Sequence, residues 1–219
     1  MTLQNYNPTL LTHGEMKQMV DLQKVAIAHL DSEDVLQPLT VDEFTYILNG
    51  NGFIVGLFDE GRLIAFRALL APPLDADHLG LDAGLSGESL MHVIYQELSI
   101  VHPDYRGRGL QMQMGEWVMN QIDRSRYDYV CATVAPFNIA SLKDKFALGL
   151  QIVALKRKYE GKLRYVFMKK LHITQVHRNF TEERLIPMSD IMQQQLLLNE
   201  GFVGCEMQYT SEWHVVYRK

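Results

Sequence analysis

Apolar positions near the start of the chain recur at helical spacing. Over Met16–Leu30 they fall on one face of a helix, and Thr12 with Glu15 forms a capping-box pattern in front of it. The same Thr-x-x-Glu pattern recurs from Thr40 and predicts a second helix over Thr40–Leu48. The chain therefore begins with a predicted pair of helices.

Apolar runs of strand length follow, and turns or helices separate them. Strands are predicted at Phe53–Phe58, Leu63–Leu70, Met91–Val101, Tyr127–Val134, Leu150–Leu155 and Leu163–Leu171. Helices are predicted at Leu110–Ile122 and at Asn138–Leu148, with Asn138 as N-cap and Gly149 as the C-terminal stop. Residues 71–90 are rich in Pro, Gly, Asp and Ser, which predicts a long loop that is either functional or mobile.

The last part of the chain has a pattern of its own. A polar stretch around Gln175–Glu183 leads into it. The pattern predicts a strand, a helix and two strands, at Arg184–Ile186, Asp190–Asn199, Phe202–Met207 and Trp213–Tyr217. We therefore expect a main domain over residues 1–171 and a β-α-β-β extension over residues 172–219, packed on the core or on a second subunit of a homodimer.

The 219 residues are 47% hydrophobic and 21% charged, which is the composition of a globular protein with one core or one core and a small appendage. The apolar runs are too short to span a membrane, and Met1–Pro8 lacks the pattern of a secretory signal. Cys131 and Cys205 are interpreted as buried thiols, because they cannot form a disulfide framework and have no partner at metal-ligand spacing. We expect a cytoplasmic protein without a metal site or a membrane partner.

The net charge of −5 argues against a nucleic-acid partner, but the charge is unevenly distributed. Residues 1–105 carry 4 basic and 15 acidic side chains, whereas residues 106–170 carry 13 basic and 5 acidic ones. A basic middle in an acidic chain favours a phosphorylated small ligand over a polyanion. Ordinary solvated side chains are the alternative interpretation of the same charges.

The segment Leu98–Gln111 carries the most informative pattern, because a strand, a proline, two glycines and a helix start follow one another in it. Gly107 and Gly109 let the backbone turn its N–H groups toward one point, and the helix start adds its dipole, so the loop can cradle a diphosphate. Arg106 and Arg108 can add charge-assisted contacts. The spacing fits neither a P-loop nor a Rossmann fingerprint.

This segment resembles the signature of the GNAT superfamily of acyl-CoA-dependent N-acetyltransferases. Val101-His-Pro103 and Arg106-Gly-Arg-Gly109-Leu110 match its Val-x-Pro and Arg/Gln-x-x-Gly-x-Gly/Ala elements. A second match is Pro136-Phe-Asn138-Ile-Ala-Ser141, followed by Gly149. The resemblance covers about residues 10–171. It implies an α/β fold of the α+β kind, in which helices flank both sides of a mixed, mainly antiparallel sheet.

The resemblance also implies acetyl-CoA as co-substrate. In such enzymes the strand before the motif bulges near its proline, and the freed main-chain groups hold the pantetheine arm. The implied cofactor-binding residues are Ser99, Ile100, Val101, Arg106, Gly107, Arg108, Gly109, Leu110, Gln111, Asn138 and Ser141. Gln111 stands where the family usually has Gly or Ala, and a plain N-cap is an equal reading of Asn138.

For the chemistry, the resemblance implies a base at Glu97, where several family members carry an acidic residue. An ordinary half-exposed strand residue is the alternative, and alternation along the strand places Gln96 on the opposite face. The family's usual tyrosine acid is replaced by Lys145, which could act as a cation near the leaving thiolate. Tyr129, Tyr159 or water are the other candidates for protonating the thiolate.

The resemblance thus implies an N-acetyltransferase that moves an acetyl group from acetyl-CoA to a primary amine of a small molecule or peptide, by direct attack in a ternary complex. The acidic first part of the chain favours a cationic acceptor, held by Asp75, Asp77 and Asp82 of the long loop, although a solvated acidic loop is the alternative. Two further functions stay open. The chain could be a non-catalytic acyl-CoA-binding or sensing module, or an interaction protein that uses residues 172–219 to bind a partner.

Overall fold

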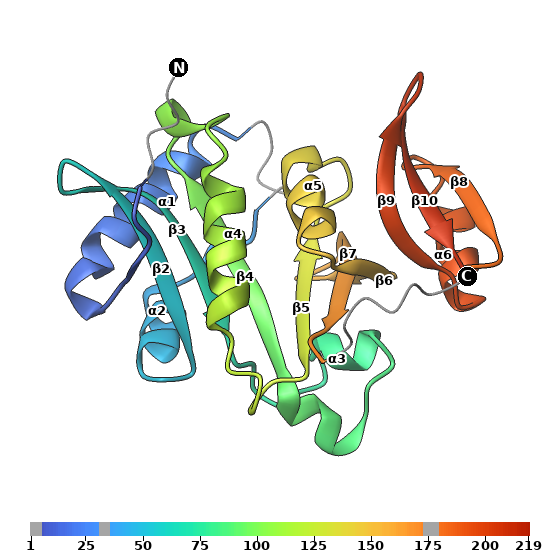
Figure 1. The fold of residues 1–219 in the computed structure, drawn as a ribbon, viewed down its shortest axis with the longest axis horizontal. Coiled ribbons are helices and arrows are strands. Elements are labelled where there is room, and N and C mark those ends of the chain that lie inside the picture. Colours follow the sequence, from blue (N-terminus) through green and yellow to red (C-terminus); the bar gives the residue numbers. More distant parts are fainter. Residues whose placement is uncertain (1–5, 31–35, 173–179) are drawn as a thin grey trace. The chain divides into compact units, whose positions relative to one another are not determined.

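The computed structural model describes residues 6–30, 36–172 and 180–219. The chain divides into two compact units (Figure 1). The first comprises Met1–Pro72 and Ile94–Ile122, and the second comprises Pro73–Val93 and Asp123–Lys219. Most of the polar stretch predicted around Gln175–Glu183 lies outside the described residues.

Antiparallel strands form the sheet of the first unit. They pair in chain order, as β1 (Thr9–Leu10), β2 (Gly52–Asp59), β3 (Arg62–Leu70) and β4 (Val93–Val101). The helices of this unit are α1 (Met16–Ile27), α2 (Val41–Leu48) and α4 (Leu110–Gln121). Both predicted capping boxes are formed, by Thr12 with Glu15 and by Thr40 with Glu43. The Thr40 box caps α2 itself, whereas the Thr12 box caps a 3-10 turn at His13–Glu15 that leads directly into α1.

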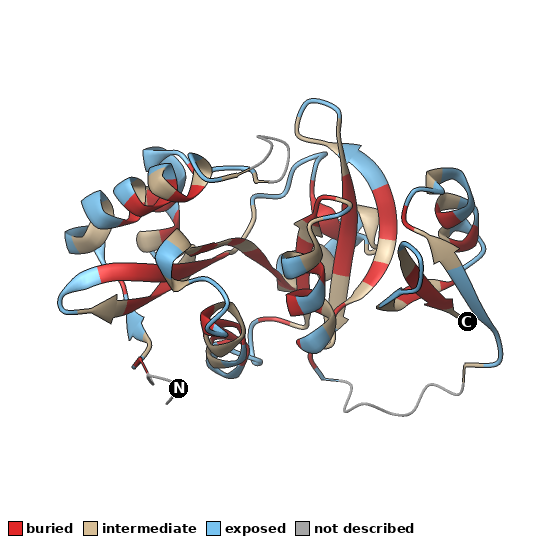
Figure 2. Ribbon diagram, turned by 90° about the horizontal axis from the view of Figure 1, so that it is seen from above, coloured by how far each residue is buried: buried red, intermediate tan, exposed pale blue. Residues whose placement is uncertain are grey.

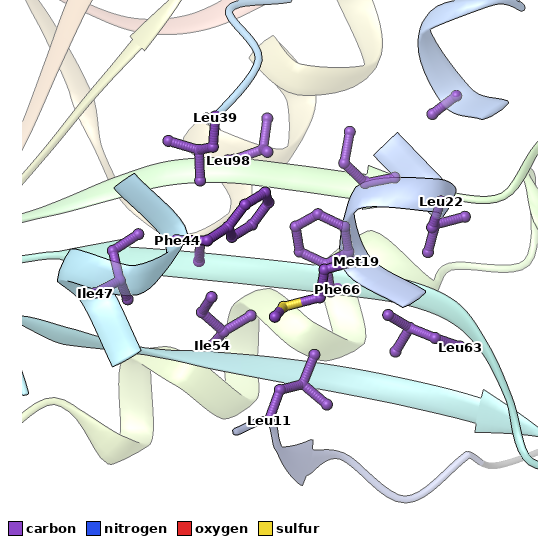
Figure 3. Close-up of a cluster of buried hydrophobic side chains, with 13 residues drawn as sticks. Leu11, Met19, Leu22, Leu39, Phe44, Ile47, Ile54, Leu63, Phe66 and Leu98 are labelled. Carbon is purple, nitrogen blue, oxygen red and sulfur yellow. The ribbon is translucent and has the colours of Figure 1, made fainter. Parts of the chain in front are cut away.

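One face of this sheet packs against α1 and α2. Met19 and Leu22 of α1, Phe44 of α2 and Phe66 of β3 meet in a buried hydrophobic cluster (Figure 3). The rings of Phe44 and Phe66 pack edge to face with their centroids 5.8 Å apart. Leu98 joins the cluster from β4. The core therefore holds β4 in register under the two helices.

The opposite face of the sheet packs against α4. Because side chains alternate along a strand, Phe66 in the α1/α2 cluster places Arg67 on the α4 side of β3. On α4 itself, buried positions recur at helical spacing at Leu110, Met114 and Val118. Figure 2 shows the same division, with buried positions on the strands and on one side of the helices and exposed positions on their outer sides. This unit has helices on both sides of its sheet.

Strand β4 contains a β-bulge at Glu97. In the pairing of β3 with β4, Ala68 lies opposite Leu98 and the next residue, Leu69, lies opposite Gln96. Glu97 is therefore the extra residue of β4, without a partner position on β3. The bulge lies before the last residues of the strand rather than next to Pro103, where the family resemblance implied it.

The second unit is also built on an antiparallel sheet. Its strands lie in the order β5 (Tyr129–Val134), β7 (Lys162–Lys170), β6 (Gln151–Lys158), β9 (Val203–Tyr209), β10 (Trp213–Arg218) and β8 (Glu183–Pro187). Its helices are α3 (Leu79–Asp82), α5 (Ile139–Ala147) and α6 (Ile191–Asn199). Helix α6 packs on β6 and β9. This sheet therefore runs from strands of the predicted main domain into those of the predicted extension.

The strands β6 and β9 meet at Ile152 and Gly204, which pair antiparallel. A Cβ atom added to Gly204 would lie 2.9 Å from the Cβ of Ile152. Only a residue without a side chain allows this approach. Glycine is thus required at position 204, where β9 of the predicted extension pairs closely with β6 of the predicted main domain.

The structure confirms the predicted mixed, mainly antiparallel sheet flanked by helices and corrects the sequence reading at residues 71–90. This segment is not a continuous loop, because it contains α3 and a 3-10 helix at Gly87–His92, so β4 begins at Val93 instead of Met91. Lys156 and Lys158 of β6 hold the segment through Asp82, with both Nζ atoms 2.9 Å from its carboxylate oxygens. Strand β1 was missed, since a two-residue strand leaves no periodic pattern.

Candidate functional site

The loop before α4 has the geometry of an anion cradle. Gly107 and Gly109 adopt left-handed backbone conformations, with φ angles of 74° and 76°. Gly109 is the N-cap of α4, and the first intrahelical bond runs from the Gln113 N–H to the Gly109 carbonyl. The amide groups of residues 109–112 therefore precede the helical ladder. A Cβ atom at either glycine would meet nothing within 4 Å, so the space beside the loop is open.

The loop arginines are exposed and held by neighbouring groups. Arg106 reaches the end of α1, where its guanidinium donates to the carbonyl oxygens of Ala26 and His29 at 3.5 and 3.4 Å. Arg108 donates to the carbonyl of Asp104 at 2.9 Å and stacks over the Tyr105 ring at 4.7 Å. The two arginines thus extend from the loop toward α1 and toward Tyr105, and their charges can attract an anion to the cradle.

The end of β4 contributes differently at each predicted position. The Ile100 side chain belongs to the α1/α2 cluster, so its main chain is the part of this residue that a ligand could reach. Ser99 lies opposite Arg67, and its hydroxyl oxygen is buried without a hydrogen-bond partner in the described part of the chain. A buried hydroxyl in this state is one that a ligand can satisfy. Val101, the last residue of β4, is partly exposed.

Glu97 sits in the bulge of β4 with a perturbed carboxyl. Burial raises its pKa to about 7, and the carboxylate of Glu43 on α2 adds to this shift. Gln96 points the other way, because its amide donates to the Met119 sulfur of α4. The two neighbours thus face opposite sides, as strand alternation predicts. A carboxyl with a pKa near 7 is suited to accept a proton at neutral pH.

In the second unit, Asn138 and Ser141 bind each other. Asn138 is the N-cap of α5, and its side-chain oxygen accepts from the Ser141 N–H at 3.2 Å. The N-cap reading of Asn138 therefore holds. The preceding Phe137 is exposed and has a φ angle of 66°, a conformation that residues other than glycine seldom adopt.

Lys145 is a buried residue of α5. Its Nζ atom lies 3.0 Å from the carboxylate of Asp144, and both side chains are almost fully buried. Each charge of such a buried pair depends on the other, because removing one would leave an unpaired charge in the interior. Of the other acid candidates, Tyr159 forms a 3.1 Å hydrogen bond with the Thr133 hydroxyl at the end of β5.

The three candidate acceptor carboxylates lie close together but have protein partners. Asp82 is 12% exposed and binds Lys156 and Lys158. Burial acts to raise the pKa of Asp82, but the hydrogen bonds from both lysines outweigh it and hold the pKa below its usual value. Asp77 is 93% exposed, 3.7 Å from the Lys158 ammonium, and its N–H binds the carboxylate of Asp75. The basic and acidic stretches of the sequence partly neutralise each other here.

The predicted site residues thus form two groups. The first unit holds Glu97, Ser99, Ile100, Val101 and the loop from Arg106 to Gln111, whereas the second holds Asn138, Ser141, Lys145 and the three aspartates. Sequence reasoning missed the roles of Glu43 and Arg67 beside the first group, because the sequence shows Glu43 only as part of the capping box of α2 and Arg67 has no motif of its own.

Cys131 is fully buried, and burial raises its pKa to about 12, whereas Cys205 is only partly buried. Across residues 6–30, 36–172 and 180–219, no group of three or more His, Cys, Asp or Glu side chains is placed to hold a metal ion. Nor does any described helix have the length and apolar character needed to cross a membrane.

Neither the protein-family models nor the curated protein sequences contain a match to this chain. Solved structures do match it. An N-acetyltransferase from Staphylococcus aureus Mu50 has a TM-score of 0.59 and 15% identity, over 77% of this chain and 99% of its own. A putative acetyltransferase from Salmonella typhimurium, solved with its cofactor acetyl-CoA, has a TM-score of 0.59 and 13% identity, over 78% and 96%.

A third match is an acetyltransferase of the GNAT family from Streptococcus pneumoniae, with a TM-score of 0.58 and 15% identity, over 76% of this chain and 99% of its own. Identities this low establish a shared fold and leave the activity to be argued from the site. This chain has the fold of the GNAT family of N-acetyltransferases.

Proposed function

We propose that this protein is an acetyl-CoA-dependent N-acetyltransferase acting on a primary amine of a small molecule or peptide. The observation that carries the proposal is the loop from Arg106 to Gln111, where two left-handed glycines precede the start of α4 and two exposed arginines flank them. In this proposal residues 1–171 form the acetyltransferase domain, and residues 172–219 form an extension packed on it.

Acetyl-CoA fits the groups that the first unit offers. The free amide groups at the start of α4 would bind the diphosphate, and Arg106 and Arg108 would neutralise its charge. The main chain of Ser99, Ile100 and Val101 would line the pantetheine arm. The buried Ser99 hydroxyl supports this placement, because an arm rich in amide groups can give it a hydrogen-bond partner.

The reaction follows from the same placement. The neutral amine nitrogen attacks the thioester carbonyl carbon, the new C–N bond forms, and the C–S bond breaks as the thiolate of CoA leaves. Main-chain N–H groups near Ile100 or Val101 would stabilise the negative charge on the carbonyl oxygen. The proton lost by the amine passes to Glu97, directly or through a water, and solvent protonates the thiolate.

Glu97 is the base in this scheme because of where it lies and how it ionises. It projects from the bulge of β4, on the strand whose end would hold the thioester. Its pKa of about 7 leaves a large fraction ionised at neutral pH while making it a better proton acceptor than an ordinary carboxylate. The buried ion pair of Lys145 supports a scheme in which this lysine orders α5 and solvent acts as the acid.

The acceptor in this proposal is a cationic amine. Asp42 and Glu43 lie in the first turn of α2, and Glu43 acts on Glu97, so negative charge gathers near the base. Asp75 and Asp77 of the second unit are further candidates for holding the acceptor. Asp82 is the weakest of the three loop residues for this role, because its carboxylate already binds two lysines.

A second candidate function is a non-catalytic acyl-CoA-binding module. The observation that favours it is Lys145, which stands where the family usually has a tyrosine acid and is buried in an ion pair. Such a module would bind acetyl-CoA with the same loop but release no thiol.

A thiol-release assay separates the two functions. The protein is incubated with acetyl-CoA and a panel of cationic, neutral and anionic amines, and free CoA is measured with a thiol reagent. We expect amine-dependent release that is fastest with a cationic amine. Binding of acetyl-CoA without release across the panel would favour the non-catalytic module, and absence of binding would exclude both functions.

A further inference from the structure

Arg67 is a charged side chain on a buried, largely apolar face of the sheet. It lies on the α4 side of β3 and is 0% exposed. Its pairing partner on β2 is Val55, and Leu69 follows it on the same face of β3, both of them fully buried. Burying a guanidinium is costly, so a position that served packing alone would be occupied by an apolar residue.

The guanidinium of Arg67 contacts the first turn of α4. Its Nη2 atom donates to the carbonyl oxygen of Gln111 at 3.1 Å, and its Nη1 atom donates to the side-chain oxygen of Gln96 at 3.4 Å. The amide of Gln96 in turn donates to the sulfur of Met119, near the other end of α4. Arg67 thus ties the sheet directly to the helix start and, through Gln96, to the last turn of the helix.

The peptide group that Arg67 binds is part of the anion cradle. The carbonyl of Gln111 belongs to the same peptide group as the N–H of Met112, which precedes the first intrahelical hydrogen bond at Gln113. A cationic donor on the oxygen polarises the peptide and makes its N–H a stronger donor. The contact also fixes the direction in which this N–H points.

We propose that Arg67 is a positioning residue for the diphosphate of CoA, acting through the Gln111–Met112 peptide group. This inference rests on the proposed function of the loop from Arg106 to Gln111. Because its guanidinium is fully buried, Arg67 acts from beneath the loop and leaves direct contact with the ligand to Arg106 and Arg108. Its effect is specific to the part of the ligand that carries the diphosphate.

The test compares CoA with pantetheine, which has the arm but no diphosphate. Calorimetry gives the Kd of each ligand for the wild type and for Arg67→Met, which keeps the length of the side chain and removes the charge. We expect Arg67→Met to raise the Kd of CoA about tenfold, the effect of losing one charge-assisted hydrogen bond. The Kd of pantetheine should stay unchanged.

Two further variants serve as controls for the loss of a buried arginine and for the loss of charge. Arg164→Met removes another buried arginine that donates to a main-chain carbonyl, on β7 of the second unit, and should leave the ratio of the two Kd values as in the wild type. Arg67→Lys keeps the charge and should lose less CoA affinity than Arg67→Met. If Arg67→Met is not folded at the assay temperature, the Kd ratio of Arg67→Lys replaces it, and an unchanged ratio overturns the proposal.

The outcomes separate this proposal from the proposed function. If folded Arg67→Met loses the same affinity for both ligands, or loses affinity for neither, the role of Arg67 is overturned. The proposed binding of CoA by the wild type is not affected by that result. A wild-type protein that binds CoA no better than pantetheine overturns both.

Discussion

The carboxylate of Glu43 on α2 acts on the carboxyl of Glu97 in the bulge of β4. Burial is the larger cause of the raised pKa of Glu97, about 7, and repulsion by Glu43 is the second. Glu43 itself is fixed by the capping box of α2, because its carboxylate accepts from the N–H and the hydroxyl of Thr40, both at 2.7 Å. A helix cap thus places the charge that tunes the proposed base.

The pH dependence of turnover tests this relationship. If Glu97 must be ionised to accept the proton, turnover should rise with pH through about 7. Glu43→Gln removes the charge but keeps a residue that can form the capping box, so it should move this acidic limb to lower pH. Glu97→Gln should abolish the limb and lower turnover about 10²–10⁴-fold, with CoA affinity nearly unchanged.

The measurement is kcat against pH for the three proteins, with the Kd of acetyl-CoA as control. A limb that stays in place in Glu97→Gln would assign the titration to another group.

Turnover is predicted to rise with pH through the pKa of Glu97, whereas protein stability should fall over the same pH range. Its folded pKa of about 7 lies above the ordinary 4.5, so the folded state binds this proton more tightly than the unfolded chain. The stabilisation is complete below pH 4.5 and is lost as the pH rises through about 7. Glu97→Gln should therefore melt at a higher temperature than the wild type at pH 8 and show no such advantage at pH 4.

Thermal unfolding at a series of pH values measures this effect. The same change at the exposed Glu60 is the control and should reproduce the wild-type curve. Identical pH dependence of wild type and Glu97→Gln would show that the carboxyl is not perturbed.

The exposed loop carboxylates test the acceptor. Replacing Asp75 and Asp77 by Asn should raise the KM for a cationic amine, more strongly at low salt, with little change in the KM for acetyl-CoA. Asp82→Asn is treated separately, because it breaks the ion pairs with Lys156 and Lys158 and should lower the melting temperature at neutral pH. If the protein prefers anionic or neutral amines, the cationic acceptor is wrong.

The residues after position 171 should be needed for stability. Gln194 of α6 accepts from the hydroxyls of Tyr165 and Tyr217 at 2.7 and 2.9 Å and donates to the carbonyl of Met188. Gln194→Ala leaves these buried groups without a partner and should cost about 2–4 kcal/mol of unfolding free energy. The matched change at the exposed Gln193 should cost close to nothing.

Truncation after Leu171 removes this network together with β8, β9 and β10. We expect a lower melting temperature or a changed assembly state, measured by calorimetry and light scattering. A truncated chain with unchanged melting temperature and unchanged mass would contradict the packing of the extension on its core.

The sequence predicted the parts of the fold that depend on local chemistry. Thr40 with Glu43 predicted the start of α2, and Gly107 with Gly109 predicted the turn into α4. Both predictions succeed because helix caps and left-handed glycines depend only on neighbouring residues. Segment 71–90 was mistaken for a loop. Within it, Asp82 at the end of α3 binds lysines of β6 that follow more than 70 residues later, a contact that no local pattern shows.

In the candidate site, too, local features could be predicted and features that depend on distant residues could not. The loop residues from Arg106 to Gln111 could be found from their spacing, but the tuning groups around them could not. Arg67 looks like a surface residue until β3 is paired with β4 and covered by α4. Lys145 and Asp144 are neighbours in the sequence, but adjacent positions on a helix do not face each other, so neither their ion pair nor its burial follows from the pattern.

The most direct test of acetyl-CoA binding at this loop is calorimetry on two glycine variants. Gly109 and Gly61 have φ angles of 76° and 80°, and both have open space at the Cβ position, so a glutamate strains the backbone equally at each. Gly109→Glu places its charge where the diphosphate must lie, whereas Gly61→Glu places it in the turn between β2 and β3. We predict that Gly109→Glu abolishes acetyl-CoA binding and that Gly61→Glu retains wild-type affinity; undiminished binding by Gly109→Glu would contradict the account.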